Sequence, residues 1–300
     1  MKPDLEKLRL SGRISATARE TCKKMIEPGV RLEDIALEAE RIIRDMGGEP
    51  AFPAQLSRNH IAAHYCSAPN DTTEVQPGDI IKLDLGTHVD GYVTDNATTV
   101  DLQAGPDSAL VAASRMALDN AIGLMGPGVS IVEIGRTIED TAKAFGFNPV
   151  YNLTGHGVAR FVIHCAPSIP NYPDPGAGRL RAGQTVACEP FICDGKGYIE
   201  SRGTAEVFGL KRKPKPKDKL PPEIEKAVAA TQGLPFARRT LRRHLDDDKA
   251  VEQTLKLLKK AKILIDYPPL VERKGVRVAQ TEHTIFIGED GPEVLTLAPE

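Results

Sequence analysis

Acidic residues that could bind metal stand within apolar, strand-like segments of this 300-residue chain. Asp84 and Asp95 lie in two such segments, which are joined through a turn at Asp90-Gly91. A hairpin at this turn would bring the two carboxylates together, where they would repel unless they shared a proton or held cations. Their apolar neighbours argue against simple solvation of the charges. Taken alone, the pair has an alternative interpretation as ordinary turn aspartates.

Three further residues complete a candidate metal-binding set. His156 lies between two glycines, which permit close approach to an ion or a substrate. Glu189 ends an apolar segment and Glu282 lies between two strand-like segments, and a charge in such a place needs a partner. Four carboxylates with one imidazole suit two hard or borderline divalent ions better than one structural zinc. Two such ions can activate water near neutral pH and stabilise a tetrahedral intermediate.

The elements that must position these residues recur roughly a hundred positions later in the sequence. A Pro-Gly turn precedes an amphipathic helix twice, with the helices expected over 32–45 and 131–145, and another helix is expected over 4–26. An apolar strand that ends in a carboxylate also occurs twice, at Asp84 and at Glu189. A duplicated helix–helix–strand unit packs as two related halves with sheets inside and helices outside. We expect an α+β fold with an internal pseudo-twofold, a central antiparallel sheet and the site at the junction of the halves.

The region 206–270 departs from this repeat. It begins with the Lys/Pro loop, defined as Lys211 to Lys217, and helices are then expected over 222–232, 236–244 and 249–262. Strand-like segments resume at 276–280 and 284–287. We predict a helical insertion subdomain at 206–270, within a catalytic domain formed by 1–205 plus 271–300. The Lys/Pro loop is interpreted as solvated, with a contact to ribosomal RNA as the alternative.

Composition limits the classes of protein to which the chain can belong. Hydrophobic residues make up 41% and charged residues 27%, as in ordinary globular proteins. A net charge of −2 gives no overall attraction to nucleic acid or anionic membrane. The five cysteines form no CxxC pair, and the chain begins without a secretory signal, which favours free thiols in a reducing cytosol. We expect a cytoplasmic protein without a membrane or a specific nucleic-acid partner.

Short motifs throughout the chain carry a family resemblance. They are Ala51-Phe52-Pro53, Ala62 to Tyr65, Lys82 to His88, Gly91 to Asn96, Gly155-His156, Ile163-His164, Glu189-Pro190-Phe191, Asp266 to Leu270 and Ala279 to Thr284. In this order they make the chain similar to the type 2 methionine aminopeptidases of the pita-bread metallopeptidase family, in the compact archaeal form. The similarity runs from about Leu5 to the C-terminus, and the insertion distinguishes type 2 from type 1.

The resemblance implies a role for each matching metal ligand. Asp84 would bind one metal, His156 with Glu189 the other, and Asp95 with Glu282 would bridge them. Two divalent ions per chain are implied, of cobalt, manganese, iron or zinc. Activated water would attack the first peptide bond and remove the initiator methionine of nascent polypeptides, preferentially before a small second residue.

The resemblance also implies residues that contact the substrate. His64 would lie beside the metals and bond the substrate or intermediate, His164 would contact the scissile peptide, and Glu189 would also shuttle a proton. Phe52, Ile163, Phe191 and Tyr267 would line an apolar pocket for the methionine side chain. Without the resemblance, most of these residues would be interpreted as core. One departure concerns Ser201 to Leu210, which lacks the His or Tyr that relatives often carry there.

Two other functions remain open at this stage. An X-Pro peptidase would use similar ligands, but such relatives usually carry an additional N-terminal domain before the metal-site strands. A non-catalytic relative that binds RNA or proteins would be expected to have lost ligands, whereas all five positions are filled here. The simplest expectation is a monomeric enzyme that acts on nascent N-termini and makes at most a transient contact with the ribosome.

Overall fold

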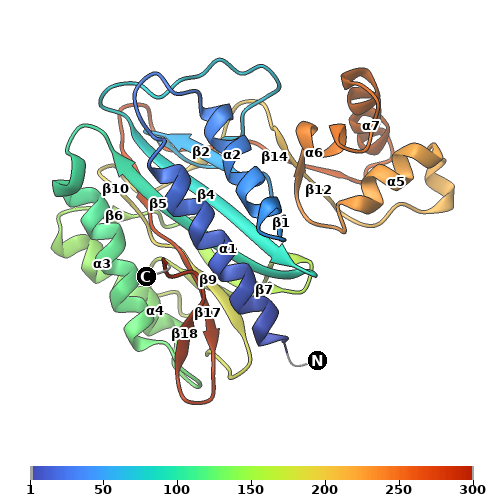
Figure 1. The fold of residues 1–300 in the computed structure, drawn as a ribbon. Coiled ribbons are helices and arrows are strands. Elements are labelled where there is room, and N and C mark those ends of the chain that lie inside the picture. Colours follow the sequence, from blue (N-terminus) through green and yellow to red (C-terminus); the bar gives the residue numbers. More distant parts are fainter. Residues whose placement is uncertain (1–2, 299–300) are drawn as a thin grey trace.

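Helices surround a set of antiparallel sheets in the computed structural model, which describes residues 3–298 (Figure 1). The helices are α1 (Leu5–Lys23), α2 (Leu32–Asp45), α3 (Ala109–Leu124), α4 (Ile131–Ala144), α5 (Pro222–Ala230), α6 (Arg238–Arg242) and α7 (Asp248–Lys260). The strands of the first half are β1 (Glu49–Pro50), β2 (Gln55–Arg58), β3 (Ile61–Ala63), β4 (Ile80–Val89) and β5 (Tyr92–Asp101).

The remaining strands follow α4 in the chain. They are β6 (Asn148–Pro149), β7 (Thr154–Ala159), β8 (Val162–Pro170), β9 (Thr185–Cys188), β10 (Phe191–Cys193), β11 (Glu200–Ser201), β12 (Val207–Leu210), β13 (Phe236–Ala237), β14 (Leu264–Tyr267), β15 (Leu270–Val271), β16 (Val278–Gln280), β17 (His283–Ile287) and β18 (Pro292–Val294).

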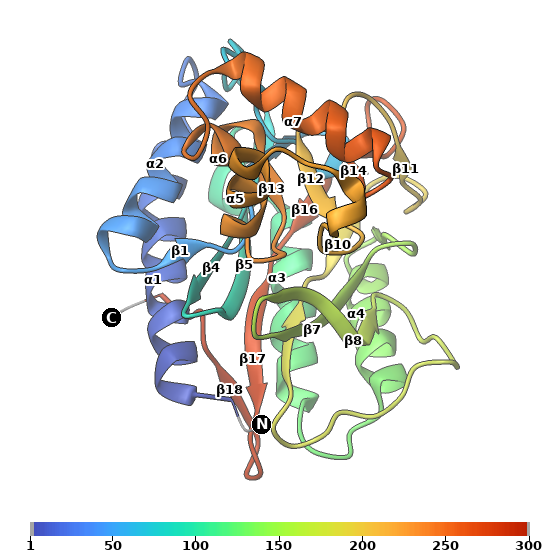
Figure 2. The same ribbon diagram turned by 90° about the vertical axis from the view of Figure 1, so that its right-hand side faces the viewer.

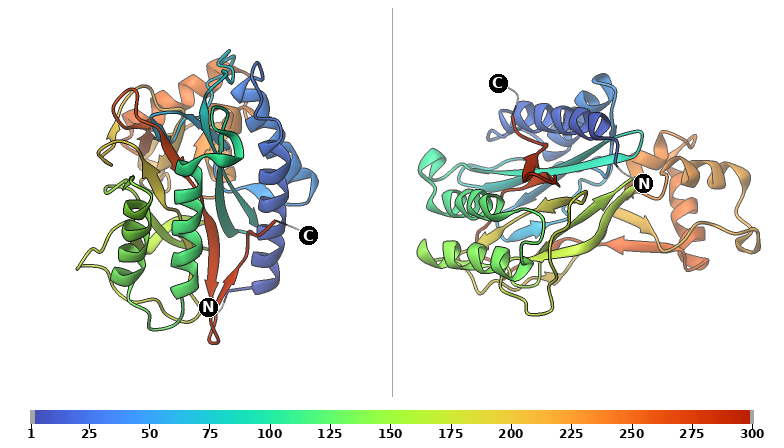
Figure 3. Two further views of the ribbon diagram at one scale, coloured as in Figure 1. Left: turned by 90° about the vertical axis from the view of Figure 1, so that its left-hand side faces the viewer. Right: turned by 90° about the horizontal axis from the view of Figure 1, so that it is seen from below.

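The two helix pairs lie on opposite sides of the molecule, with the strands between them (Figures 2 and 3). Apolar residues at helical spacing on α1 and α2, such as Ile14 and Ile35, pack against Leu83 of β4 in one core. Ile134 of α4 packs with Val186 of β9 in a second core. Each pair is followed by a two-residue strand, β1 or β6. The duplicated arrangement expected from the sequence is therefore confirmed.

The hairpin of β4 and β5 is the longest ladder in the part of the chain that the structure describes. Its strands pair from Ile80↔Asp101 to Val89↔Tyr92. The turn residues Asp90 and Gly91 both have positive φ, 51° and 83°, as a two-residue hairpin turn with the twist of a sheet requires. The register places Asp95 opposite Gly86, so the predicted hairpin is confirmed.

The region predicted to be an insertion, residues 206–270, lies to one side of the helix pairs (Figure 1). It has a hydrophobic cluster of its own around Phe208, Phe236 and Leu258. We refer to this region below as the insertion. It contains a three-stranded sheet in the order β13-β12-β14 as well as helices. The prediction of a helix over 236–244 is wrong at its start, because Phe236 and Ala237 form strand β13 and pair with β12. The helix begins at Arg238. A short apolar strand and the start of a helix cannot be distinguished by local periodicity.

None of the helices described here is long and apolar enough to cross a bilayer.

Candidate metal centre

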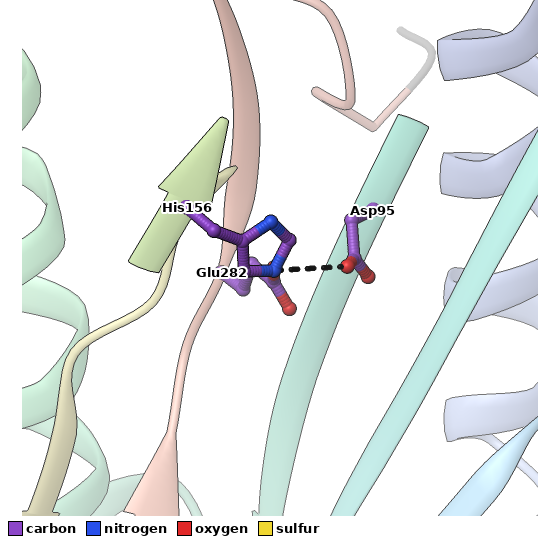
Figure 4. A group of neighbouring side chains, drawn as sticks. All are labelled: Asp95, His156 and Glu282. Carbon is purple, nitrogen blue, oxygen red and sulfur yellow. Dashed lines mark ion pairs between the residues drawn. The ribbon is translucent and has the colours of Figure 1, made fainter. Parts of the chain in front are cut away.

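Three side chains from separate segments meet between the two halves (Figure 4). Asp95 comes from β5, His156 from β7 and Glu282 from the residues between β16 and β17. Their potential ligand atoms all lie within 4.8 Å of one another, and His156 Nε2 is 3.7 Å from Asp95 Oδ2. Ala97 of β5 pairs with Glu282 in an isolated antiparallel β-bridge. This pairing holds the carboxylates of Asp95 and Glu282 side by side.

The other two predicted ligands join the same cluster. Glu189 Oε1 lies 3.5 Å from His156 Nε2. The Nε2 amide of Gln280 donates to Glu189 Oε2 and Asp84 Oδ2, both at 3.3 Å, and to Glu282 Oε2 at 3.4 Å. The structure thus brings together all five residues singled out in the sequence, although they come from five segments. Gln280 was not predicted; its only local signal is its position two residues before Glu282 on an extended segment.

The cluster has too much negative charge for its surroundings. Burial raises the pKa of Asp84 to about 7. Burial, reinforced by neighbouring carboxylates, holds the pKa values of Asp95, Glu189 and Glu282 well above their usual range. Burial also lowers the pKa of His156 to about 3, so its imidazole is neutral and can serve as a ligand.

Several oxygens of the cluster lack partners. Asp84 Oδ1, Asp95 Oδ1 and Glu282 Oε1 are buried and accept no hydrogen bond from the residues that the structure describes. A buried acceptor without a partner is costly, and the single amide of Gln280 cannot serve four carboxylates. Divalent cations would satisfy these oxygens and compensate the charge, so this donor set fits a metal centre.

A cavity of about 330 Å³ opens above the cluster. Its lining includes all six residues predicted to contact the substrate: Phe52, His64, Ile163, His164, Phe191 and Tyr267. It also includes residues that sequence reasoning missed: Gln55, Asn152, Leu153, Val207, Pro235 and Leu270. Val207 lies in the segment Ser201 to Leu210, where no aromatic or imidazole ring was expected, and it supplies an apolar wall there.

His64 is held in an unusual backbone conformation at the edge of this cavity. Its φ is 67°, a left-handed value uncommon for histidine, and its N–H donates to Gln55 Oε1 at 2.9 Å. Burial, with the nearby His164, lowers the pKa of His64 to about 4. Nδ1 of His64 is buried and has no hydrogen-bond partner among the described residues. The ring is therefore neutral near pH 7 and retains a free nitrogen.

His164 lies against the metal-binding candidate His156. The two ring centroids are 4.2 Å apart in an edge-to-face arrangement, and burial lowers the pKa of His164 as well. Away from the cluster, His244 is exposed and His60 is half-buried. His88 packs against Phe161.

Residues 6–215 match the model of metallopeptidase family M24. The chain belongs to metallopeptidase family M24. It is 39% identical over 292 residues to a methionine aminopeptidase of Archaeoglobus fulgidus, covering 97% of this chain and 98% of that relative. This M24 peptidase is accordingly a hydrolase of the aminopeptidase class, and the metallopeptidase family uses divalent metal.

Solved structures agree with this assignment. A methionine aminopeptidase of Thermotoga maritima matches with a TM-score of 0.71 at 25% identity, over 99% of each chain. A thermophilic Arx1 matches with a TM-score of 0.83 at 19% identity, over 99% of this chain and 91% of that one, which concerns the fold alone. The expected pita-bread fold of this M24 peptidase is confirmed.

Proposed function

We propose that this M24 peptidase is a type 2 methionine aminopeptidase of the compact archaeal form, which removes the initiator methionine before a small second residue. The observation that carries the proposal is the buried cluster of four carboxylates and one imidazole at the base of the cavity. The end-to-end similarity to an archaeal methionine aminopeptidase supports the same activity. It favours this activity over that of an X-Pro peptidase, because the relative that matches over 97% of this chain is a methionine aminopeptidase.

Two divalent ions would be held by the five ligands. Asp84 would bind one ion, His156 and Glu189 would bind the other, and Asp95 and Glu282 would bridge them. The unpartnered oxygens of Asp84, Asp95 and Glu282 support cation binding by this set. Cobalt, manganese, iron and zinc all accept such ligands. Bound there, the ions would supply Lewis acidity and an activated water.

The side chains around the cluster would orient the substrate and move its proton. Neutral His64, with its free Nδ1, bonds the substrate or the tetrahedral intermediate. His164 contacts the scissile peptide. Glu189, whose pKa is raised by burial and by Asp84, carries the proton of the attacking water to the leaving amine.

The apolar walls of the cavity would select the N-terminal side chain. Phe52, Ile163 and Phe191 are buried and line the space next to the cluster, and Tyr267 closes it from the insertion. An unbranched thioether adapts well to such a space. A tight space beyond the ligands would favour a small second residue.

The cellular setting follows from the same activity. All five cysteines are free, as in a reducing compartment, and nascent N-termini emerge in the cytoplasm, so we place the enzyme there as a monomer. Within the Lys/Pro loop, Arg212 pairs with Asp218, while Lys211, Lys213, Lys215 and Lys217 are exposed. The loop is interpreted as solvated. Salt-sensitive co-sedimentation with ribosomes, lost when these lysines become glutamine, would instead favour a transient ribosome contact.

The test is a peptidase assay on metal-stripped protein with manganese, cobalt, iron or zinc added back. Metal-dependent release of methionine from Met-Ala-Ser, with little from Met-Leu-Ser, supports the proposed activity and its preference. Cleavage of Ala-Pro-Ser alone would assign the chain to X-Pro peptidases. Metal binding without any cleavage would favour a non-catalytic role.

A further inference from the structure

A buried arginine connects the insertion to the rest of the molecule. Arg239 is the second residue of α6, just after β13. Its guanidinium donates to Oε1 of Glu40 from Nη2 at 2.7 Å and from Nε at 2.9 Å. Glu40 lies on α2, outside the insertion. The Glu40 side chain is only 4% exposed and that of Arg239 15% exposed. We call this pair the Arg239–Glu40 latch.

The latch also holds two segments that line the cavity. Nη2 of Arg239 donates to the carbonyl of Ala54 at 3.1 Å, and Glu40 Oε1 accepts from the Ala54 N–H at 3.3 Å. Nη1 of Arg239 donates to Cys66 Sγ at 3.0 Å and to the carbonyl of Ser67 at 3.4 Å. Ala54 is two residues from Phe52 in the chain, and Cys66 is two residues from His64.

On the insertion side, Arg239 is tied to another wall of the same cavity. Ala237 pairs with Val207 of β12, which in turn pairs with Tyr267 of β14. Val207 and Tyr267 both line the cavity. Cys66 packs against Ala237, Val207 and Tyr267 in one buried cluster that crosses the boundary.

We propose that Arg239 is a positioning residue: the Arg239–Glu40 latch fixes how far the insertion wall stands from the metal side of the cavity, and so which N-terminal side chain fits. The proposal rests on the proposed function, because the cavity is taken as the methionine pocket. A buried ion pair is a poor source of stability compared with apolar packing, but its planar fork sets one geometry. Directional bonds to Ala54 and Ser67 add to that geometry.

The test uses Arg239→Met, which keeps volume and removes the donors, and Glu40→Gln, which is milder and preserves an acceptor. Arg238→Met is the matched control, because Arg238 bonds to Glu206 and Glu252 within the insertion and does not reach α2. We expect Arg239→Met to raise KM for Met-Ala-Ser about tenfold and to change kcat less than about twofold. Arg239→Met should also discriminate less between N-terminal Met and Phe. The KM and selectivity of Glu40→Gln should lie between those of the wild type and Arg239→Met. Arg239→Lys, which keeps the positive charge, should recover part of the loss.

A second readout is independent of activity. Cys66 is 5% exposed and lies under Arg239, so opening of the latch should expose its thiol. Alkylation by iodoacetamide, followed by peptide mass spectrometry, should be about tenfold faster at Cys66 in Arg239→Met than in the wild type. Cys22 and Cys188, which are fully buried elsewhere, should remain protected and thereby exclude global unfolding.

The outcomes separate the two proposals. An Arg239→Met protein with the KM and selectivity of Arg238→Met, and with Cys66 protected, would overturn the latch. If the wild type cleaves no Met peptide, the proposed function fails. Faster labelling of Cys66 in Arg239→Met would then still support the latch between the two parts, and unchanged labelling would refute it.

Discussion

At the scale of single residues, Gln280 places one amide among three carboxylates of the cluster. Each carboxylate oxygen can accept more than one hydrogen bond, so a single neutral donor leaves most of this capacity unused. In metal-free protein the unsatisfied charge is relieved by protons, which is why the pKa values are raised. Divalent ions and protons thus compete for the same oxygens.

Asp95 is proposed to bridge both ions, so its loss should be especially damaging. We expect Asp95→Ala to reduce kcat/KM about a hundredfold or more and to lower metal occupancy, while circular dichroism shows the fold largely intact. Asp90→Asn is the control, because Asp90 is exposed at the hairpin turn and asparagine tolerates its positive φ. Full activity in a metal-replete Asp95→Ala protein would contradict the bridging role.

The raised carboxylate pKa values predict how stability depends on pH. With the pKa of Asp84 near 7, the folded metal-free protein binds more protons than the unfolded chain between about pH 6.5 and 8.5. Its free energy of unfolding should therefore fall as pH rises, by on the order of 1 kcal/mol from Asp84 alone. The three other carboxylates of the cluster add to this fall, because their pKa values are also raised. His64 and His156 oppose it by roughly 0.4 kcal/mol each, because they are neutral when folded and about half protonated at pH 6.5 when unfolded.

Urea unfolding of chelator-treated protein at about pH 6.5 and pH 8.5 measures how the free energy of unfolding changes with pH. Saturating manganese or cobalt should remove the carboxylate contribution to this change, because carboxylates bound to metal are already ionised. If the metal-free and metal-saturated proteins show the same dependence of unfolding free energy on pH, the carboxylates are not protonated in the folded metal-free state.

At the scale of elements, the β4–β5 hairpin positions two proposed ligands, Asp84 and Asp95. It also determines where Phe52 lies in the cavity wall. Gly86 lies opposite Asp95 in the ladder, and a Cβ added to Gly86 would come within 2.4 Å of the Phe52 ring. The strand can therefore approach Phe52 only because residue 86 has no side chain. This close approach makes the position of Phe52 depend on one backbone atom of β4.

Gly86→Ala should displace Phe52 from its place in the wall. We expect KM for Met-Ala-Ser to rise about tenfold, kcat to change less, and the free energy of unfolding to fall by about 1–3 kcal/mol. Gly123→Ala is the matched control, since nothing lies within 4 Å of its added Cβ and alanine favours its helix. Equal KM values in the two variants would exclude a role for the Gly86–Phe52 contact.

Much of this element-level structure can be predicted from the sequence. The turn residues Asp90 and Gly91 and the flanking apolar residues determine the hairpin locally. The bonds of Gln280 to Asp84 and of Arg239 to Glu40 cannot be predicted in the same way, because 196 and 199 positions separate the partners. The local sequence around Gln280 or Arg239 contains no pattern that would identify a partner so far away in the chain. The strand at Phe236 was missed for a similar reason, since its pairing with β12 outweighs the local pattern.

At the scale of the whole molecule, the proposed metal ligands come from elements of both halves of the repeat. Asp84 and Asp95 come from the first half, and His156 and Glu189 come from the second. Ions bound to this cluster would connect the halves and stabilise the folded state without requiring any change in the cores. The proposed metal centre would therefore link the two halves structurally as well as carry the chemistry.

Divalent metal should raise the melting temperature of chelator-treated protein. At about a hundred times the dissociation constant, binding adds roughly 2.7 kcal/mol. For a chain of this size that corresponds to a rise of several degrees in differential scanning fluorimetry. Asp95→Ala should lose most of this rise. A wild-type protein with an unchanged melting temperature in metal would be inconsistent with a shared centre.

The division of the cavity has a consequence for how this enzyme can change over evolutionary time. The carboxylates and His156 lie outside the insertion, whereas Val207, Pro235 and Tyr267 reach the cavity from within it. Mutations confined to residues 206–270 can therefore alter which N-terminus is accepted and leave bond hydrolysis intact. Part of substrate selection can thus change independently of the chemistry, and exchange of insertions between relatives offers a direct route to new specificities.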